Sequence, residues 1–436
     1  MNSGHTEPGK QGTHMSATSV DTAPPGKTSA KTAIWPILLI TALFFFWGMA
    51  NNLNDILIPQ FKKAFVLTDF ESSLVQQAFY AGYFIMAIPA GLLMRRFGYK
   101  AAVITGLVIF ALGAFSFYPG AEIRQYPWLL GALFVIASGL AFLETSANPL
   151  MTILGDEKHA AFRLNLAQAF NPLGSIIGLL VGRTFILSGI EKLNTTADFV
   201  RETKAVQMPY LVIGALVLAW AALVALTKFP AAATKSVHDE AEAKMGPFEA
   251  IGNLFKHKHF LMGVVAQFFY VGAQVGLWSY TIRYAQAEIH ITDKLASDYT
   301  TASLIIFAIG RFVGTGLMRV IPPSRLLGVF AVINIGLTAY AASVGGQYGL
   351  YALVAASFFM SIMFPTIFAT SVRGLGPLTK PGASLLVMSI IGGAVLTAVM
   401  GKVSDMSQIK TAIFVPLACF IVIALYGLGS KKEVQA

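Results

Sequence analysis

Two acidic residues with amide side chains beside them stand inside apolar stretches of this sequence. Asp55 follows Asn51 by four residues and Asn52 by three, and Glu144 precedes Asn148 by four. At these spacings the side chains of each group share one face of a helix. An ionisable residue at membrane depth costs about 3 kcal/mol on insertion scales, so it marks a functional site by default. The predicted chemistry is uptake and release of a proton by a carboxylate among hydrogen-bonding amides.

The two acids are expected at different depths. Glu144 lies 17 residues after Pro127 and 12 before Asp156, roughly 25 Å and 18 Å from the two ends of a helix. Asp55 lies seven residues before Lys62, about 10 Å from an end. Glu144 is therefore the mid-membrane acid and Asp55 the outer one. Because removal from water favours the protonated carboxyl group, both are candidates for proton coupling.

A structural alternative for either acid is a permanent ion pair with an arginine inside a span. The candidate partners are Arg183, Arg283 and Arg311. For Arg183 and Arg311 a role in helix packing or gating is favoured over contact with a substrate.

Further amides and aromatics supply the groups that a polyhydroxylated molecule would need. Asn165, Gln168 and Asn171 recur every three residues and form a third polar stripe. If the stripes converge, they line a water-filled cavity. Farther along the chain, Gln274 and Trp278 offer an amide for hydroxyl groups and an aromatic face for C–H groups. Core packing alone is an equal explanation for many of these aromatics.

Membrane-spanning helices must position these residues. The chain has 436 residues, 56% hydrophobic and 12% charged, and its mean hydropathy of +0.67 is far above that of water-soluble domains. Apolar stretches of roughly 20 residues recur, the length of a spanning helix, without the alternation typical of a barrel. The fold class is therefore an all-α polytopic membrane protein. Its predicted spans are 34–58, 72–94, 101–119, 128–154, 162–188, 209–227, 259–287, 298–319, 326–344, 349–371, 384–404 and 411–429.

The longest internal polar stretch separates two halves of six spans each. The predicted organisation is a disordered tail (1–32), a first half (33–227), a central loop (228–258), a second half (259–430) and a short tail (431–436). Nineteen Lys and Arg residues fall on the side of the termini and eight on the other. The positive-inside rule therefore places both termini in the cytoplasm.

Several other classes of function are disfavoured. The net charge of +10 comes from residues in short loops, which indicates topology rather than nucleic-acid binding. His257 and His259 lack metal-site spacing, Cys419 is alone, and no phosphate-binding loop is present. We expect no metal, no cofactor and no enzymatic activity. The expected partners are a small molecule and the lipid bilayer.

Sequence motifs along almost the whole chain after residue 33 resemble one known family. These motifs are NNLNDILIPQF, LETSANP, FRLNLAQAFN, AQFFYVGAQ, WSYTIRYA, GRFVGTG and FPTIF. Together they are similar to the major facilitator superfamily and, within it, to the fucose–galactose–glucose:proton symporters.

The resemblance implies a monomeric, proton-coupled sugar importer of the bacterial inner membrane that works by alternating access. Among the sugars of that family, the resemblance favours L-fucose as the one transported. In that family the aspartate matching Asp55 is required for transport, and the glutamate matching Glu144 is the protonation-linked acid near the sugar. The amide side chains that match Gln168 and Asn171 are implicated in recognising and transporting the sugar.

Two positions depart from the expected patterns. Gly91 to Lys100 reads GLLMRRFGYK, so that Arg95 stands where the superfamily carries an acid, and the usual charge relay is in doubt. Phe364 replaces a tyrosine before Pro365, which removes a hydroxyl group from the expected cavity.

Rival functions remain open at this stage. A glucose or galactose symporter coupled to protons or sodium fits the same residues, since a carboxylate with amides can bind either cation. A proton-driven drug exporter would use the same acids, but its cavity would be more apolar than that of a sugar transporter. A sugar sensor would need a signalling domain, for which neither the tail nor the central loop is large enough.

Overall fold

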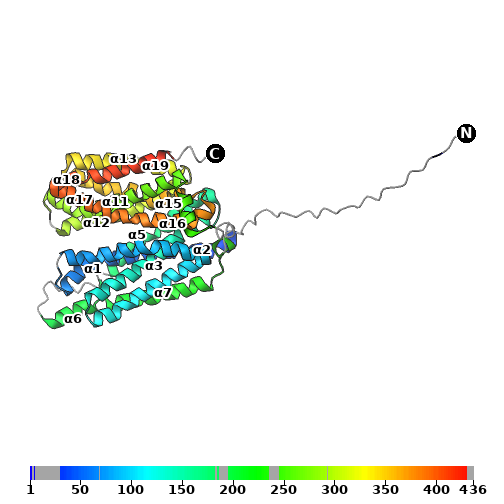
Figure 1. Ribbon diagram of the computed structural model, residues 1–436. Helices are drawn as coiled ribbons and strands as arrows, with labels where there is room; N and C mark the ends of the chain where they lie inside the picture. The colour runs from blue at the N-terminus through cyan, green and yellow to red at the C-terminus, as the bar shows by residue number, and fades with distance from the viewer. Residues whose placement is uncertain are drawn as a thin grey trace.

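The computed structural model describes residues 1, 4, 30–67, 69–181, 184–185, 195–234, 245–291 and 293–429, and only the backbone at some helical positions, 51–56 among them. The described secondary structure is helical, and the helices form two groups that lie side by side (Figure 1). The first group consists of α1 (Ala30–Ala64), α2 (Asp69–Glu122), α3 (Tyr126–Ile153), α4 (Ala160–Gln168), α5 (Phe170–Val181), α6 (Thr196–Lys204) and α7 (Gln207–Leu226). The second consists of α11 (Lys258–Ile289), α12 (Asp293–Leu317), α13 (Pro323–Val344), α14 (Gly346–Met360), α15 (Met363–Val372), α16 (Thr379–Met388), α17 (Gly392–Met406), α18 (Ile409–Ala412) and α19 (Phe414–Gly429).

Short elements join these helices. They are η1 (Glu157–His159), η3 (Gly376–Leu378) and η4 (Ser389–Ile391), with α8 (Ala231–Thr234) and α10 (Pro247–Leu254) in the central connection. Residues 228–258 were predicted as a loop, and their described part instead contains these two short helices. We call the end of the bundle that carries η1, η3 and this central connection the connector end, and the other the far end.

Nine helical stretches in the described ranges are long and apolar enough to cross a membrane. One of them, Leu74–Glu122, has 49 residues, about 74 Å of helix and more than two bilayer crossings. Gly98 breaks it with φ 84° and ψ 173°, a backbone conformation that glycine adopts without steric cost. The chain reverses there, so α2 supplies the second and third predicted spans. With α1 and the proline-broken helices, the path agrees with twelve crossings in two six-helix halves.

Two of the predicted spans are broken just before a proline. The fifth is divided at Ala169 into α4 and α5, and the tenth is divided between Met360 and Met363 into α14 and α15. Each break precedes a proline, Pro172 or Pro365. A proline has no N–H for the carbonyl four residues earlier and its ring crowds that turn, which explains both breaks.

Small residues let α1 and α5 pack with their backbones in contact. A Cβ atom on Gly174 would overlap the carbonyl oxygen of Phe45, and one on Gly48 would overlap that of Asn171. The four-residue spacing of Gly174, Gly178 and Gly182 in the sequence predicts such a face of small residues for close helix packing, and these contacts agree with it. Gly182, the third predicted member of that face, lies outside the described residues.

Substituting Gly174 with valine should destabilise the first half. The added side chain meets backbone atoms that cannot rotate away, so we expect a loss of about 2–3 kcal/mol, typical of overpacking. Thermal unfolding of the purified protein in detergent would reveal it as a lower midpoint. Gly131→Val is the matched control, because no atom lies within 4 Å of a Cβ at Gly131. Equal midpoints for the two variants would contradict the predicted contact.

Candidate functional site

A chain of buried polar side chains crosses the middle of the first half. Glu144 and Asn148 lie one turn apart on α3 and are 2% and 0% exposed. Gln168, at the end of α4, donates a hydrogen bond from Nε2 to Oδ1 of Asn148 over 2.9 Å. The predicted stripes of the fourth and fifth spans therefore meet through Asn148 and Gln168.

Glu144 lacks the partners that a buried carboxylate usually has. Its Oε2 atom makes no hydrogen bond in the described part of the protein. Asn148 Nδ2 and Trp47 Nε1 are likewise buried without a hydrogen-bond partner among the described residues. Because such groups are costly to bury unsatisfied, they are suited to bind a proton, water or a ligand hydroxyl.

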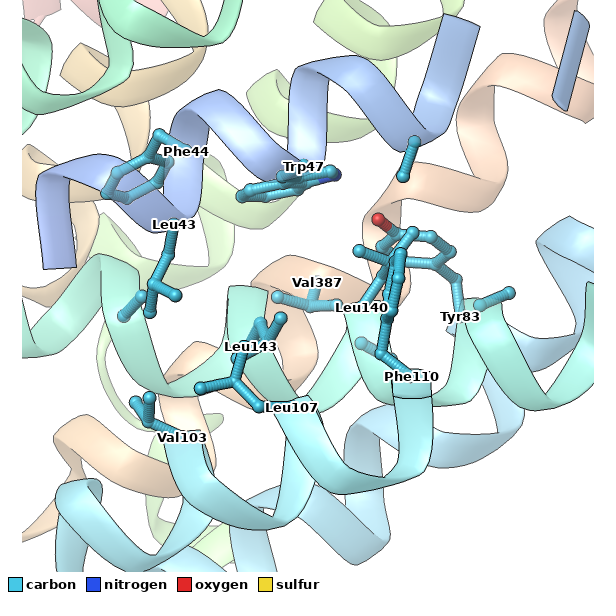
Figure 2. Close-up of a cluster of buried hydrophobic side chains, with 14 of the residues drawn as sticks. Leu43, Phe44, Trp47, Tyr83, Val103, Leu107, Phe110, Leu140, Leu143 and Val387 are labelled. Carbon is cyan, nitrogen blue, oxygen red and sulfur yellow. The ribbon is translucent and has the colours of Figure 1, made fainter. Parts of the chain in front are cut away.

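Tyr83 of α2 stands next to this acid, and Trp47 of α1 lies beside Tyr83. Tyr83 is 4% exposed and lies close enough to Glu144 for an electrostatic interaction. Figure 2 shows the indole of Trp47 reaching toward the Tyr83 hydroxyl, over a layer of leucines from α2 and α3. Val387 of the second half enters the same layer (Figure 2). The acid is therefore shielded by aromatic and aliphatic side chains.

Two of the three proposed ion-pair partners of Glu144 are engaged elsewhere. Arg311 donates to Gln168 and to the carbonyl of Ser361. Arg283 is an exposed side chain that lies over the ring of Tyr280, 5.1 Å from its centroid. Arg183 lies outside the described residues. Within the described ranges Glu144 therefore has no ion pair, and the alternatives that involve Arg183 or Asp55 stay untested.

The side chains of three further predicted site residues, Asn171, Gln274 and Trp278, are among those that the structure describes. Asn171 and Gln274 are half-buried, on α5 and α11. Trp278 is also half-buried, and its Nε1 donates to Oγ of Ser357 over 3.2 Å. Its ring meets Phe307 edge-on at 5.0 Å.

The side chains of Asn51, Asn52 and Asp55 lie outside the described residues, although α1 runs through all three positions. For these positions the predicted roles stay predictions.

Asn165 belongs to a different contact from the one its spacing predicted. Its Nδ2 donates to Oγ1 of Thr366 over 3.1 Å, which joins α4 of the first half to α15 of the second. Sequence periodicity placed Asn165 on one face with Gln168, but the two side chains bind different helices. Asn165 is therefore part of the boundary between the halves.

Several contacts between the halves lie toward the connector end. Besides Asn165–Thr366 there is an exposed ion pair of Arg373 with Glu157 at 3.5 Å. Lys380 Nζ lies 5.6 Å from the ring centroid of Tyr99. These contacts hold the connector end closed.

The two residues that depart from the expected patterns each make a contact in the structure. Arg95 donates from Nη2 to the carbonyl of Met245 over 2.6 Å, so it ties the second span to the central connection. The ring of Phe364 packs against Tyr270 at 6.2 Å. Sequence reasoning missed the polar partners Ser357, Ser361 and Thr366. The prolines that follow Gln168 and Ser361 by four residues were the available signal for the Arg311 contacts.

Comparison with known proteins agrees with this arrangement. The chain is 46% identical over 413 residues to the L-fucose-proton symporter of Escherichia coli, covering 91% of this chain and 93% of that protein. It is 36% identical to a glucose/galactose transporter of Brucella abortus, covering 95% and 100%. A crystal structure described as a major facilitator transporter, FucP, in the outward conformation superposes with a TM-score of 0.85 at 45% identity, covering 92% of this chain and 100% of that one.

A family profile described as Major Facilitator Superfamily matches residues 38–383. This match covers well over half of the chain and extends from the first group of helices into the second. The chain therefore belongs to the major facilitator superfamily.

Proposed function

We propose that this protein imports a neutral monosaccharide together with protons, by alternating access, and that L-fucose is its preferred sugar. The observation that carries the proposal is the buried Glu144, which has no ion pair among the described residues and stands one turn from an amide chain. A carboxyl group in this setting can exist protonated or charged, which proton coupling requires. The 46% identity to a protein named an L-fucose-proton symporter supports the choice of sugar.

Site roles follow from these positions. Glu144 and Asp55 carry the coupling protons. Asn51, Asn52, Asn148, Gln168 and Asn171 form the amide side of the sugar site. Gln274 and Trp278 form its second-half side. The coupling ion is H⁺ and no other cofactor is required.

Orientation and conformation complete the proposal. The protein lies in the inner membrane of a bacterium with the connector end and both chain termini in the cytoplasm, an orientation that the excess of Lys and Arg on that side supports. We further assign the closed connector end to an outward-facing state, supported by the similarity to a structure described as outward. The halves 33–227 and 259–430 act as the two moving bodies of a monomer, as repeats do in related transporter architectures.

The deciding experiment is a pH measurement with the protein reconstituted in sodium-free liposomes. L-fucose, D-galactose, D-glucose and D-arabinose are added in turn while the pH of the sugar-containing side is recorded. Alkalinisation of that side establishes proton symport and ranks the sugars. If the pH stays constant, uptake of labelled sugar is measured with and without a sodium gradient. Uptake that requires sodium would change the coupling ion, and no uptake under either condition would contradict sugar symport.

A glucose or galactose symporter is the second candidate function. It is favoured by the 36% identity to a protein named a glucose/galactose transporter and by Phe364, where the expected tyrosine hydroxyl is absent. The same liposome series separates the candidates, because the preferred sugar gives the largest alkalinisation at low concentration.

Truncation of Trp278 should weaken sugar binding. Removal of a large aromatic anchor commonly costs about 2 kcal/mol, so we expect roughly a 30-fold higher Kd for Trp278→Ala by calorimetry. Trp278→Phe keeps an aromatic face but not the hydrogen bond to Ser357, and should lose less. Trp128→Ala is the control, since this exposed indole binds the carbonyl of Ser116. Unchanged affinity in Trp278→Ala would remove this residue from the site.

A further inference from the structure

Arg311 makes three hydrogen bonds, two of which cross to the other half. It lies on α12 and is 4% exposed. Its Nε donates to the carbonyl of Ser361 over 2.5 Å, within its own half. Its Nη1 donates to the carbonyl of Gln168 over 3.0 Å and contacts Oε1 of that residue at 3.3 Å, in the other half. A single guanidinium group therefore bridges the boundary.

Both carbonyl acceptors are orphaned by prolines. Pro172 follows Gln168 by four residues, and Pro365 follows Ser361 by four. In a continuous helix the N–H at those positions would bind these two carbonyl groups, and proline has none to offer. Arg311 supplies a donor to each. Its planar fork of five N–H groups suits two acceptors on different helices, which a single ammonium group suits less well.

The surroundings of Arg311 fix its position. Its guanidinium lies 4.7 Å from the ring centroid of Phe307. The neighbouring Gly310 lets α12 approach α14, because a Cβ there would crowd the carbonyl of Phe358. Arg311 has no carboxylate partner in the part of the chain that the structure describes. A buried arginine that binds backbone carbonyls instead of an acid is better explained by the two helix breaks than by ion pairing.

We propose that Arg311 is a positioning residue that locks the two proline breaks together in the closed-connector state and must release Gln168 for the connector end to open. This inference rests on the proposed alternating access. When the halves separate, Ser361 moves with Arg311 and keeps its bond, whereas Gln168 moves away with the first half. The freed carbonyl can then bind water in the opened space.

The lock also reaches the proton site. Gln168 donates from Nε2 to Asn148, which stands one turn from Glu144 on α3. The residue that Arg311 holds is thus the residue that orients the amide beside the acid. Release of Gln168 therefore removes a contact between the halves and, in the same step, alters the chain of polar side chains beside Glu144.

A cysteine reporter on the closed boundary tests the lock without any sugar. Ala383 of α16 is 0% exposed, belongs to the core cluster of the first half and lies away from Arg311 in sequence. In an Ala383→Cys, Cys419→Ala background, the rate of maleimide labelling reports opening of the connector end. Arg311→Gln should raise this rate about tenfold or more, the effect of losing one charge-assisted hydrogen bond. Arg311→Lys should give an intermediate rate.

The prolines provide an independent second variant. Pro172→Ala restores the backbone N–H for the Gln168 carbonyl, so it should raise labelling modestly while Arg311 still reaches Oε1. In that background Arg311→Gln should add less than it does beside Pro172. Arg325→Gln is the control for loss of charge, because Arg325 is an exposed arginine of α13.

Two results would overturn the lock. One is wild-type labelling in folded Arg311→Gln, with folding checked by the thermal midpoint. The other is an effect of Arg311→Gln that is equally large with and without the Pro172→Ala substitution. Because the readout needs neither sugar nor a proton gradient, its failure is distinct from failure of the proposed symport.

Discussion

Glu144→Gln should abolish sugar accumulation while leaving sugar exchange intact. A proton that moves with the sugar across 100 mV supplies about 2.3 kcal/mol, which supports roughly 50-fold accumulation of a neutral sugar. Glutamine is close to the protonated carboxyl group in shape and polarity but cannot release a proton. We therefore expect the accumulation ratio to fall to about 1 in energised vesicles, with counterflow of labelled sugar preserved and insensitive to pH.

The matched control for this variant is Glu122→Gln. Glu122 is an exposed acid at the far end, where it pairs with Lys204 at 2.6 Å and accepts a hydrogen bond from Gln207. Its loss should leave the accumulation ratio unchanged. If Glu144→Gln still accumulated sugar against a gradient, Glu144 would not be the coupling acid, and Asp55 would have to carry that role alone.

Gly91→Leu should force the connector end open and stop transport. Gly91 lies on α2 against α16 of the other half, and a Cβ added at Gly91 would overlap Oγ of Ser384 and press on its Cβ. A leucine is larger still, so the closed state loses its packing whereas the state with separated halves does not. We expect sugar uptake to fall more than tenfold, because overpacking costs about 1–3 kcal/mol.

Cysteine labelling distinguishes opening of the connector end by Gly91→Leu from simple misfolding of that variant. Ala369 of α15 is 5% exposed and belongs to the core cluster of the first half. A cysteine at Ala369 should label faster in Gly91→Leu than in the parent protein. Gly131→Leu should change neither uptake nor labelling, since the position is open. Slower labelling in a folded Gly91→Leu protein would mean that the contact between Gly91 and Ser384 does not belong to the state with a closed connector end.

Much of the fold follows from the order of residues along the chain. Hydropathy of roughly 20-residue stretches predicted the spans, because a helix in lipid must satisfy its own backbone groups over a set thickness. The reversal at Gly98 falls between two predicted spans, whereas the break before Pro172 was not predicted, although local backbone chemistry explains both. The polar face of the fourth span, with Glu144 and Asn148, also followed from helical spacing alone. In each case the determining interactions lie within a few residues.

Only the tertiary structure decided which polar groups meet. Helical spacing placed Asn165 and Gln168 on one stripe, but Asn165 binds Thr366, 201 positions away, while Gln168 binds Asn148. Helical spacing also did not specify the partners of Arg311, which in the folded chain donates to two backbone carbonyl groups. The physical reason is that periodicity specifies the face a side chain shares within its helix. The rotation and neighbours of that helix come from packing between distant segments.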